Sequence, residues 1–110
     1  MSGSDYEREL KEKLIQEGWL VFRVAGSFVC DLVALRYYPE KEQRIIEVKS
    51  TKADTFYTSD NKEQFDILNN HAKEGFNVYY YIRWKGVNKW SKYHLPLEPY
   101  PIFRRDENDN

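Results

Sequence analysis

Charged residues interrupt two stretches of the sequence that otherwise have the apolar composition of buried β-strands. Glu47 and Lys49 lie two positions apart in one of them, so their side chains project from the same face of a strand. Asp31 begins the other stretch, and a turn containing Pro39 separates the two. If residues 39–41 form a three-residue loop, Asp31 lies opposite Lys49 and on the same face as Glu47. A loop one residue longer would break this register.

Two carboxylates on neighbouring strands are suitable ligands for a hard divalent cation, because Mg²⁺ prefers oxygen donors. Asp31 and Glu47 would supply these donors, with the backbone carbonyl of Val48 as a third, and Mn²⁺ is expected to substitute. A metal ion there would polarise a phosphate and lower the pKa of a bound water. Lys49 could orient that water or offset charge developing on the phosphate. The pattern indicates metal-dependent hydrolysis of a phosphodiester.

A structural interpretation competes with this one. A Glu-x-Lys pair on a strand is a weak signal, and taken singly it is better explained as a buried ion pair. Burying three charges is costly unless something compensates for them, so the full set of Asp31, Glu47 and Lys49 favours a functional site.

Two further charged residues lie where apolar ones are expected. Glu7 precedes Leu10 and Leu14 by three and seven positions, so it points along the apolar stripe of a helix. It either caps that helix or reaches the metal cluster, directly or through water. Arg23 is the charged residue of an apolar strand. It could be a counter-ion for Glu7 or Asp31, or it could hold a DNA phosphate through its fork of donors.

The pattern of apolar residues, caps and turns predicts seven main elements in the order α-β-β-β-α-β-β. This order is typical of an α/β domain built around a mixed sheet. Ser4 with Glu7 fits a capping box at the start of the first helix. The expected helices cover about residues 4–17 and 60–75, and the expected strands cover 19–24, 31–38, 44–49, 76–84 and 88–94.

The composition is that of one folded domain. The chain has 110 residues, of which 41% are hydrophobic and 32% charged. We expect a single domain over residues 1–105 and a disordered acidic tail over 106–110. Three of the eighteen acidic residues lie in that tail, and without them 17 basic residues face 15 acidic ones, a balance that permits DNA binding. The lone Cys30 cannot form an intrachain disulfide, and the polar N-terminus and lack of a long apolar run predict a cytoplasmic protein that does not enter a membrane.

Taken together, these residues resemble the archaeal-type Holliday junction resolvases, which belong to the PD-(D/E)xK nuclease superfamily. The resemblance runs in unbroken order from residue 5 to about residue 75. It rests on four segments: Tyr6–Leu10, Gly18–Ser27, Asp31–Ala34 and Ile46–Ser50.

The resemblance implies a restriction-endonuclease-like fold, with mixed sheet and flanking helices, and a specific set of functional residues. Glu7, Asp31 and Glu47 would form the acidic cluster, and Lys49 would be the catalytic lysine. Further residues are expected to contact DNA, and these are Arg8, Arg23, Ser27, Gln64 and Lys52.

The resemblance also implies a homodimer that places paired nicks across a four-way junction in a prokaryotic or viral setting. Recognition would depend on phosphates and branched shape rather than on base edges. Cys30, Phe28 and Val29 depart from common family residues, as does His71, which lies near a position often held by phenylalanine at the dimer surface. Cleavage of other branched or duplex DNA, and a non-catalytic DNA-binding scaffold on the same fold, are the alternatives.

Overall fold

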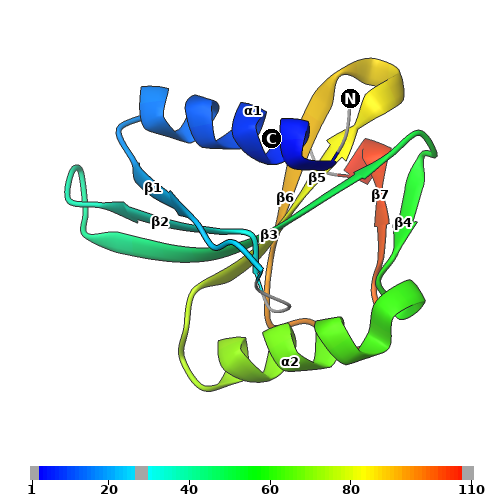
Figure 1. The fold of residues 1–110 in the computed structure, drawn as a ribbon. Helices are drawn as coiled ribbons and strands as arrows, with labels where there is room; N and C mark the ends of the chain where they lie inside the picture. The colour runs from blue at the N-terminus through cyan, green and yellow to red at the C-terminus, as the bar shows by residue number, and fades with distance from the viewer. Residues whose placement is uncertain (1–2, 27–29, 108–110) are drawn as a thin grey trace.

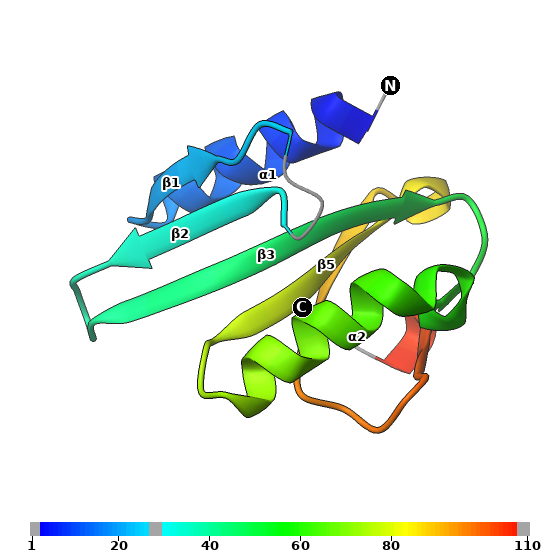
Figure 2. The same cartoon turned by 60° about the horizontal axis from the view of Figure 1, so that its bottom comes forward.

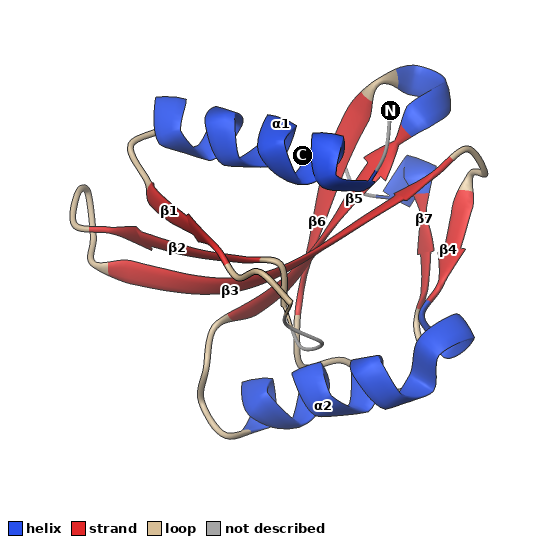
Figure 3. Cartoon of the chain, viewed as in Figure 1, coloured by secondary structure: helices blue, strands red, loops and turns tan. Residues whose placement is uncertain are grey.

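A five-stranded mixed sheet forms the centre of the protein and lies between two helices (Figure 1). The structure is a computed structural model that describes residues 3–26 and 30–107. Helix α1 lies on one face of the sheet, and helix α2 lies on the other (Figures 1 and 3). The predicted α/β class and the order of the main elements are confirmed. None of the helices in the described ranges has the length and apolar composition needed to cross a bilayer.

The elements have the following bounds. The helices are α1 (Gly3–Gln16) and α2 (Lys62–Lys73). The main sheet contains β1 (Leu20–Arg23), β2 (Leu32–Arg36), β3 (Glu42–Thr51), β5 (Val78–Trp84) and β6 (Lys89–His94). A second sheet contains β4 (Thr55–Tyr57) and β7 (Ile102–Arg104), and three short 3-10 turns cover Thr58–Asn61, Lys85–Val87 and Arg105–Glu107.

Strand β3 is the central and longest strand of the main sheet, whose order is β1-β2-β3-β5-β6. It pairs with β2 as an antiparallel hairpin and with β5 in parallel. Because parallel neighbours need a crossover connection, the chain passes through α2 between β3 and β5 (Figure 2). Residues of β3 therefore face α1 and α2 alternately.

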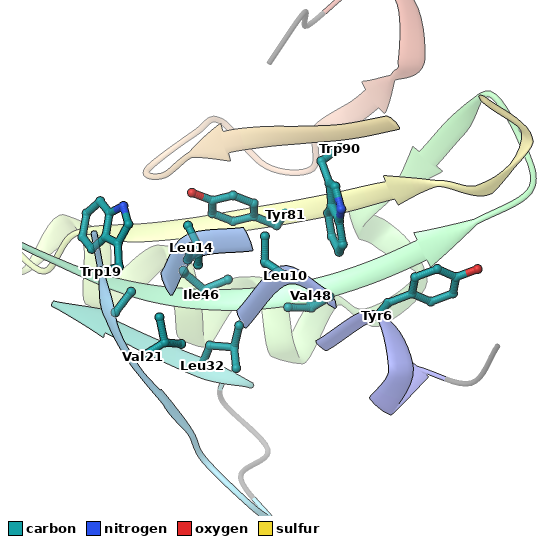
Figure 4. Packing of buried hydrophobic residues seen from close by; sticks show 11 residues of the cluster. Tyr6, Leu10, Leu14, Trp19, Val21, Leu32, Ile46, Val48, Tyr81 and Trp90 are labelled. Atoms are coloured by element: carbon teal, nitrogen blue, oxygen red, sulfur yellow. The ribbon is translucent and has the colours of Figure 1, made fainter. Parts of the chain in front are cut away.

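The apolar residues divide into one cluster on each face of the sheet. Under α1, the helix contributes Tyr6, Leu10 and Leu14 to a cluster that includes Ile46 and Val48 of β3 (Figure 4). Under α2, the cluster is formed by residues including Phe65, Leu68, Val78, Tyr80, Ile82, Trp84 and Phe103. Most of this second cluster comes from the second half of the chain.

The N-terminal ends of both helices differ from the predicted ones. Helix α1 begins at Gly3, so Ser4 lies inside its first turn and is not the predicted cap. Its C-terminus agrees with the prediction, because Gly18 adopts a φ of +97°, which a residue with a Cβ rarely adopts. Helix α2 begins at Lys62 rather than Asp60, because Asn61 is its N-cap and accepts a hydrogen bond from the Gln64 amide at 3.1 Å.

The small β4–β7 sheet was missed from the sequence. Thr55–Tyr57 and Ile102–Arg104 are each too short for a period to be recognised. They pair because the C-terminal segment returns to lie beside the segment that follows β3. Asp106 and Glu107, the first acidic residues of the expected tail, belong to a 3-10 turn. Residues 108–110 lie outside the described residues.

The packing of α1 yields the first prediction. Leu10 is fully buried against the sheet, and Ile15 on the same helix is about half exposed. Leu10→Ala is expected to lower the free energy of unfolding by about 2–5 kcal/mol, because it leaves a cavity in the core. Ile15→Ala is the matched control and should change it by less than about 0.5 kcal/mol. Urea unfolding monitored by tryptophan fluorescence measures both, and equal effects would contradict the assigned packing.

Candidate active site

The two carboxylates predicted from the sequence lie side by side at the end of the β2–β3 hairpin. The paired register is Leu32 with Ile46, so Asp31 lies alongside Glu47 and not opposite Lys49 as predicted. The reason is the loop, which spans the five residues between Arg36 and Glu42 rather than three. A shift of two residues preserves the face, and Asp31 therefore still shares its face with Glu47.

A backbone hydrogen bond fixes the position of Asp31. The Val48 amide donates to Asp31 Oδ2 at 2.8 Å, and the Asp31 amide donates to the Ile46 carbonyl at 2.9 Å. In an antiparallel pair the N–H and C=O of one residue point toward the same neighbouring strand. The carbonyl of Val48 therefore faces the side on which the Asp31 carboxylate lies, as a third metal donor requires.

Glu47 and Lys49 point toward the α2 face of the sheet. Ile46 and Val48 pack in the cluster under α1, and side chains alternate along the strand, so Glu47 and Lys49 face the opposite way. Glu47 is paired with Tyr80 in the β3–β5 register, and Tyr80 belongs to the cluster under α2.

Glu47 is the most deeply buried member of the site, with an exposed fraction of 4%. Lys49 Nζ lies 3.1 Å from Glu47 Oε2, and 30% of the lysine side chain remains exposed. Lys49 thus contacts a buried carboxylate while part of its own side chain remains in contact with solvent.

Burial raises the pKa of Glu47 from 4.5 to about 7, and the negative charge of Asp31 adds to this effect. The ion pair with Lys49 acts in the opposite direction but does not cancel the increase. Burial also raises the pKa of Tyr80, and the charge of Glu47 contributes. The site therefore holds more negative charge than Lys49 neutralises.

This donor set fits a hard divalent cation. Two carboxylates and a peptide carbonyl are oxygen ligands of the kind that Mg²⁺ and Mn²⁺ accept. The raised pKa of Glu47 shows that a second cation beside Lys49 would relieve an electrostatic cost. Asp31, Glu47 and the Val48 carbonyl are the groups that would hold it.

Glu7 is not brought to this pair of carboxylates. Its Oε1 lies 3.2 Å from Nη2 of Arg23, on the α1 side of the structure. Within residues 3–26 and 30–107, no three His, Cys, Asp or Glu side chains are close enough to share one metal ion. Of the two partners suggested for Arg23, the structure selects Glu7, and a role for Glu7 through an intervening water remains a prediction.

The residues predicted to contact DNA have different environments. Arg8 is exposed and lies 3.5 Å from Asp5, while Lys52 is exposed in the loop between β3 and β4. Gln64 is buried in the first turn of α2. Ser27 lies outside the described residues.

Asn61 is a positioning residue that the sequence interpretation overlooked. Its side chain caps α2 and holds the backbone of Gln64, which fixes the first turn of the helix on the carboxylate face. The Asn61-x-x-Gln64 spacing matches the cap position and third residue of a capping box, so this signal was available in the sequence.

Comparison with known proteins places this geometry in a family. The family model described as archaeal Holliday junction resolvase (Hjc) matches residues 1–101. This chain belongs to the Hjc family. Residues with proposed site functions, from Glu7 to Gln64, all lie within the match.

Two Hjc proteins are similar to this chain. The crossover junction endodeoxyribonuclease Hjc of Methanocaldococcus jannaschii is 44% identical over 66 residues, which are 60% of this chain and 46% of the relative. The chain thus aligns with about half the length of that curated relative. The structure of Archaeoglobus fulgidus Hjc, titled a Holliday junction resolvase from an archaeal hyperthermophile, matches with a TM-score of 0.73 at 23% identity. That match covers 93% of this chain and 83% of the other. The restriction-endonuclease-like fold is therefore confirmed.

The pKa of Glu47 predicts an unusual pH dependence for this Hjc-family protein. Between pH 4.5 and about 7 the folded state retains the Glu47 proton more than the unfolded state does, so stability is lost as the pH rises through this range. The decrease in the free energy of unfolding should approach about 3 kcal/mol when EDTA removes divalent cations. Glu47→Gln should remove it, whereas Glu12→Gln, an exposed control on α1, should not. Urea unfolding from pH 5 to pH 8 measures the difference, and parallel curves for wild type and Glu47→Gln would contradict it.

Proposed function

We propose that this protein is a structure-selective endonuclease that resolves four-way DNA junctions by metal-dependent hydrolysis of phosphodiester bonds. The observation that carries the proposal is the placement of Asp31, Glu47 and Lys49 together at one end of the β2–β3 hairpin, within the residues that match the Hjc family. The names of both similar proteins are consistent with this activity.

Each residue of the site has a distinct role in the proposed reaction. Asp31 and Glu47 hold the divalent cation, with the Val48 carbonyl as a further donor. When bound there, Mg²⁺ would polarise the phosphate and lower the pKa of a bound water, and Mn²⁺ could take its place. Lys49 keeps its ammonium within 3.1 Å of Glu47, where it can orient the nucleophilic water or offset charge on the phosphate.

Three cations with exposed side chains are suited to hold the DNA backbone. Arg8 and Lys52 are exposed, and Arg23 is nearly half exposed beside Glu7. Their interactions with phosphates would position a strand without reading its sequence. Gln64, buried on the same face as the carboxylates, would act by positioning the site rather than by an extended contact with DNA.

An exposed apolar surface on the same face of the sheet as the site supports a homodimer. Leu20 and Phe22 of β1 are 58% and 50% exposed, and they point away from α1, because Val21 between them is buried under it. Helix α2 covers β5 but leaves this part of the sheet open (Figure 2). A cavity of about 590 Å³ adjoins it, lined in part by Leu20, Leu35 and the exposed Tyr37. A second copy on this surface would be related by two-fold symmetry and would place two nuclease sites in one assembly.

A structure-selective nuclease works where branched DNA arises, so we place its action in the cytoplasm of the host.

Chemistry and junction preference can be tested together with an end-labelled four-way junction and a linear duplex of the same sequence. With Mg²⁺ we expect paired, symmetric nicks in the junction, and none in EDTA. Glu47→Ala and Lys49→Ala should each lower the rate by at least about 100-fold, because each removes a group that acts on the reacting phosphate.

Two control variants guard against nonspecific effects of lost charge. Glu12→Ala and Lys73→Ala change exposed residues away from the site and should retain the wild-type rate. Cutting of duplex and junction at equal rates would retain the nuclease and exclude junction selectivity. No cutting by a folded protein that still binds the junction would favour a scaffold.

The homodimer is tested separately by a charge at its proposed interface. Phe22→Glu should convert a dimer at micromolar concentration into a monomer, because the new carboxylate would lose its water at the interface. Ile15→Glu is the matched control, since Ile15 is equally exposed but lies on α1. Sedimentation velocity measures both. A wild type that remains monomeric at 100 µM, or a Phe22→Glu variant that remains dimeric, would exclude this interface.

A further inference from the structure

The loop between β2 and β3 carries the two most exposed large hydrophobic side chains of the described residues. Tyr37 is 78% exposed and Tyr38 is 81% exposed, whereas the other exposed residues of this kind range from 36% to 58%. The loop projects beyond both helices at the free end of the hairpin (Figures 1 and 2). We call residues 37–41 the aromatic tip. Two neighbouring rings left in water there add little to the core, so their placement points to a partner.

Polar contacts at its base hold the aromatic tip in place. Arg36 and Glu42 lie opposite each other in the β2–β3 register, and Arg36 Nη2 donates to Glu42 Oε1 at 2.9 Å. Glu42 Oε2 also accepts from Arg44 Nε at 2.6 Å and from Asn77 Nδ2 at 3.0 Å. The Arg36 guanidinium lies 4.4 Å from the ring centre of Trp19. Because the strands below it are fixed in this way, the tip presents its rings with little freedom to lose on binding.

The rings, rather than charge, are what the aromatic tip offers to a partner. Lys41 places its ammonium 5.6 Å from the ring centre of Tyr37, and the neighbouring Glu40 carries the opposite charge. Both residues are exposed. The tip therefore has no excess charge with which to attract a phosphate backbone. A flat aromatic base fits the faces of the rings whatever its sequence, because every base has a π-face.

Tyr38 is separate from the surface proposed for the homodimer. The cavity beside that surface is lined in part by Tyr37 and Lys41, whereas Tyr38 is not among the described residues that line it. Pro39 restricts its own backbone and that of Tyr38 before it. A second copy that covers Tyr37 would thus leave the ring of Tyr38 open to another partner.

The aromatic tip and the carboxylates lie at opposite ends of one hairpin. Asp31 precedes Tyr37 by six residues, which corresponds to about 20 Å along an extended strand. That length matches about six base pairs of duplex, at about 3.4 Å each. One strand of a branched DNA can therefore contact both places. Bases inside a duplex are stacked on each other, while the bases of a single-stranded segment are free to stack on aromatic side chains.

We propose that the aromatic tip binds unpaired DNA bases by stacking, with Tyr38 as the ring that contacts the base. The inference rests on the proposed function, which is why DNA rather than another protein is the partner. Tyr38 would favour branched DNA over plain duplex without contacting the scissile phosphate.

The fluorescence of 2-aminopurine tests the stacking directly. With EDTA present to prevent cleavage, the full chain is titrated into a short single strand with 2-aminopurine at its centre, and into the same strand paired in a duplex. We expect saturable quenching with the single strand and little change with the duplex. Tyr38→Ala should weaken binding to the single strand about tenfold, and Tyr38→Phe should retain it, because the ring remains. Tyr57→Ala, which removes a partly exposed tyrosine of β4, is the matched control and should bind like the wild type.

Equal binding by the wild type and Tyr38→Ala, or an equal loss in Tyr57→Ala, would overturn the proposal. A Tyr38→Ala variant that sediments as a smaller species than the wild type would also overturn it, because the ring would then be a contact between subunits. The junction cleavage assay separates this inference from the proposed function. Quenching by a protein that leaves junctions uncut would support the stacking and refute the proposed function. Junction cleavage by a protein that does not quench the single strand would refute the stacking alone.

Discussion

The structure depends on a carboxylate placed inside the central strand of its sheet. Glu47 occupies a buried position of β3, and burial is the main cause that raises its pKa to about 7. Lys49 offsets part of this cost, but Asp31 adds to it. A fold that bears such an energetic penalty in its core gains something other than stability, and affinity for a cation is the chemical gain that these groups can provide.

Alternation along β3 allows this arrangement without loss of the core. Ile46 and Val48 face α1 and contribute apolar packing, while Glu47 and Lys49 face the other way. Val48 links the two functions, since its side chain packs in the core and its amide holds the Asp31 carboxylate. A disturbance of packing under α1 would therefore reach the carboxylates through the backbone of one residue.

The sequence predicted the elements that are long or that have a strong period. Leu10 and Leu14 marked α1, and the order of elements and shared face of Asp31 and Glu47 followed from alternation. The register was wrong by two residues because loop length depends on where hairpin pairing stops, which no local pattern records. The pairing of Glu7 with Arg23 could not be chosen in advance, since it depends on how closely the N-terminal part of α1 approaches the end of β1. Strands β4 and β7 were missed because each becomes a strand only through the other.

The β4–β7 sheet has a consequence for how the limits of the domain are drawn. The family match ends at residue 101, but β7 begins at Ile102 and buries Phe103, whose ring stacks on Tyr93 at 3.9 Å and lies 5.6 Å from Tyr80. Tyr80 in turn lies beside Glu47 in the sheet. A boundary taken from family similarity would thus cut through the hydrophobic core behind the carboxylates. In this protein the family match ends before the folding unit does.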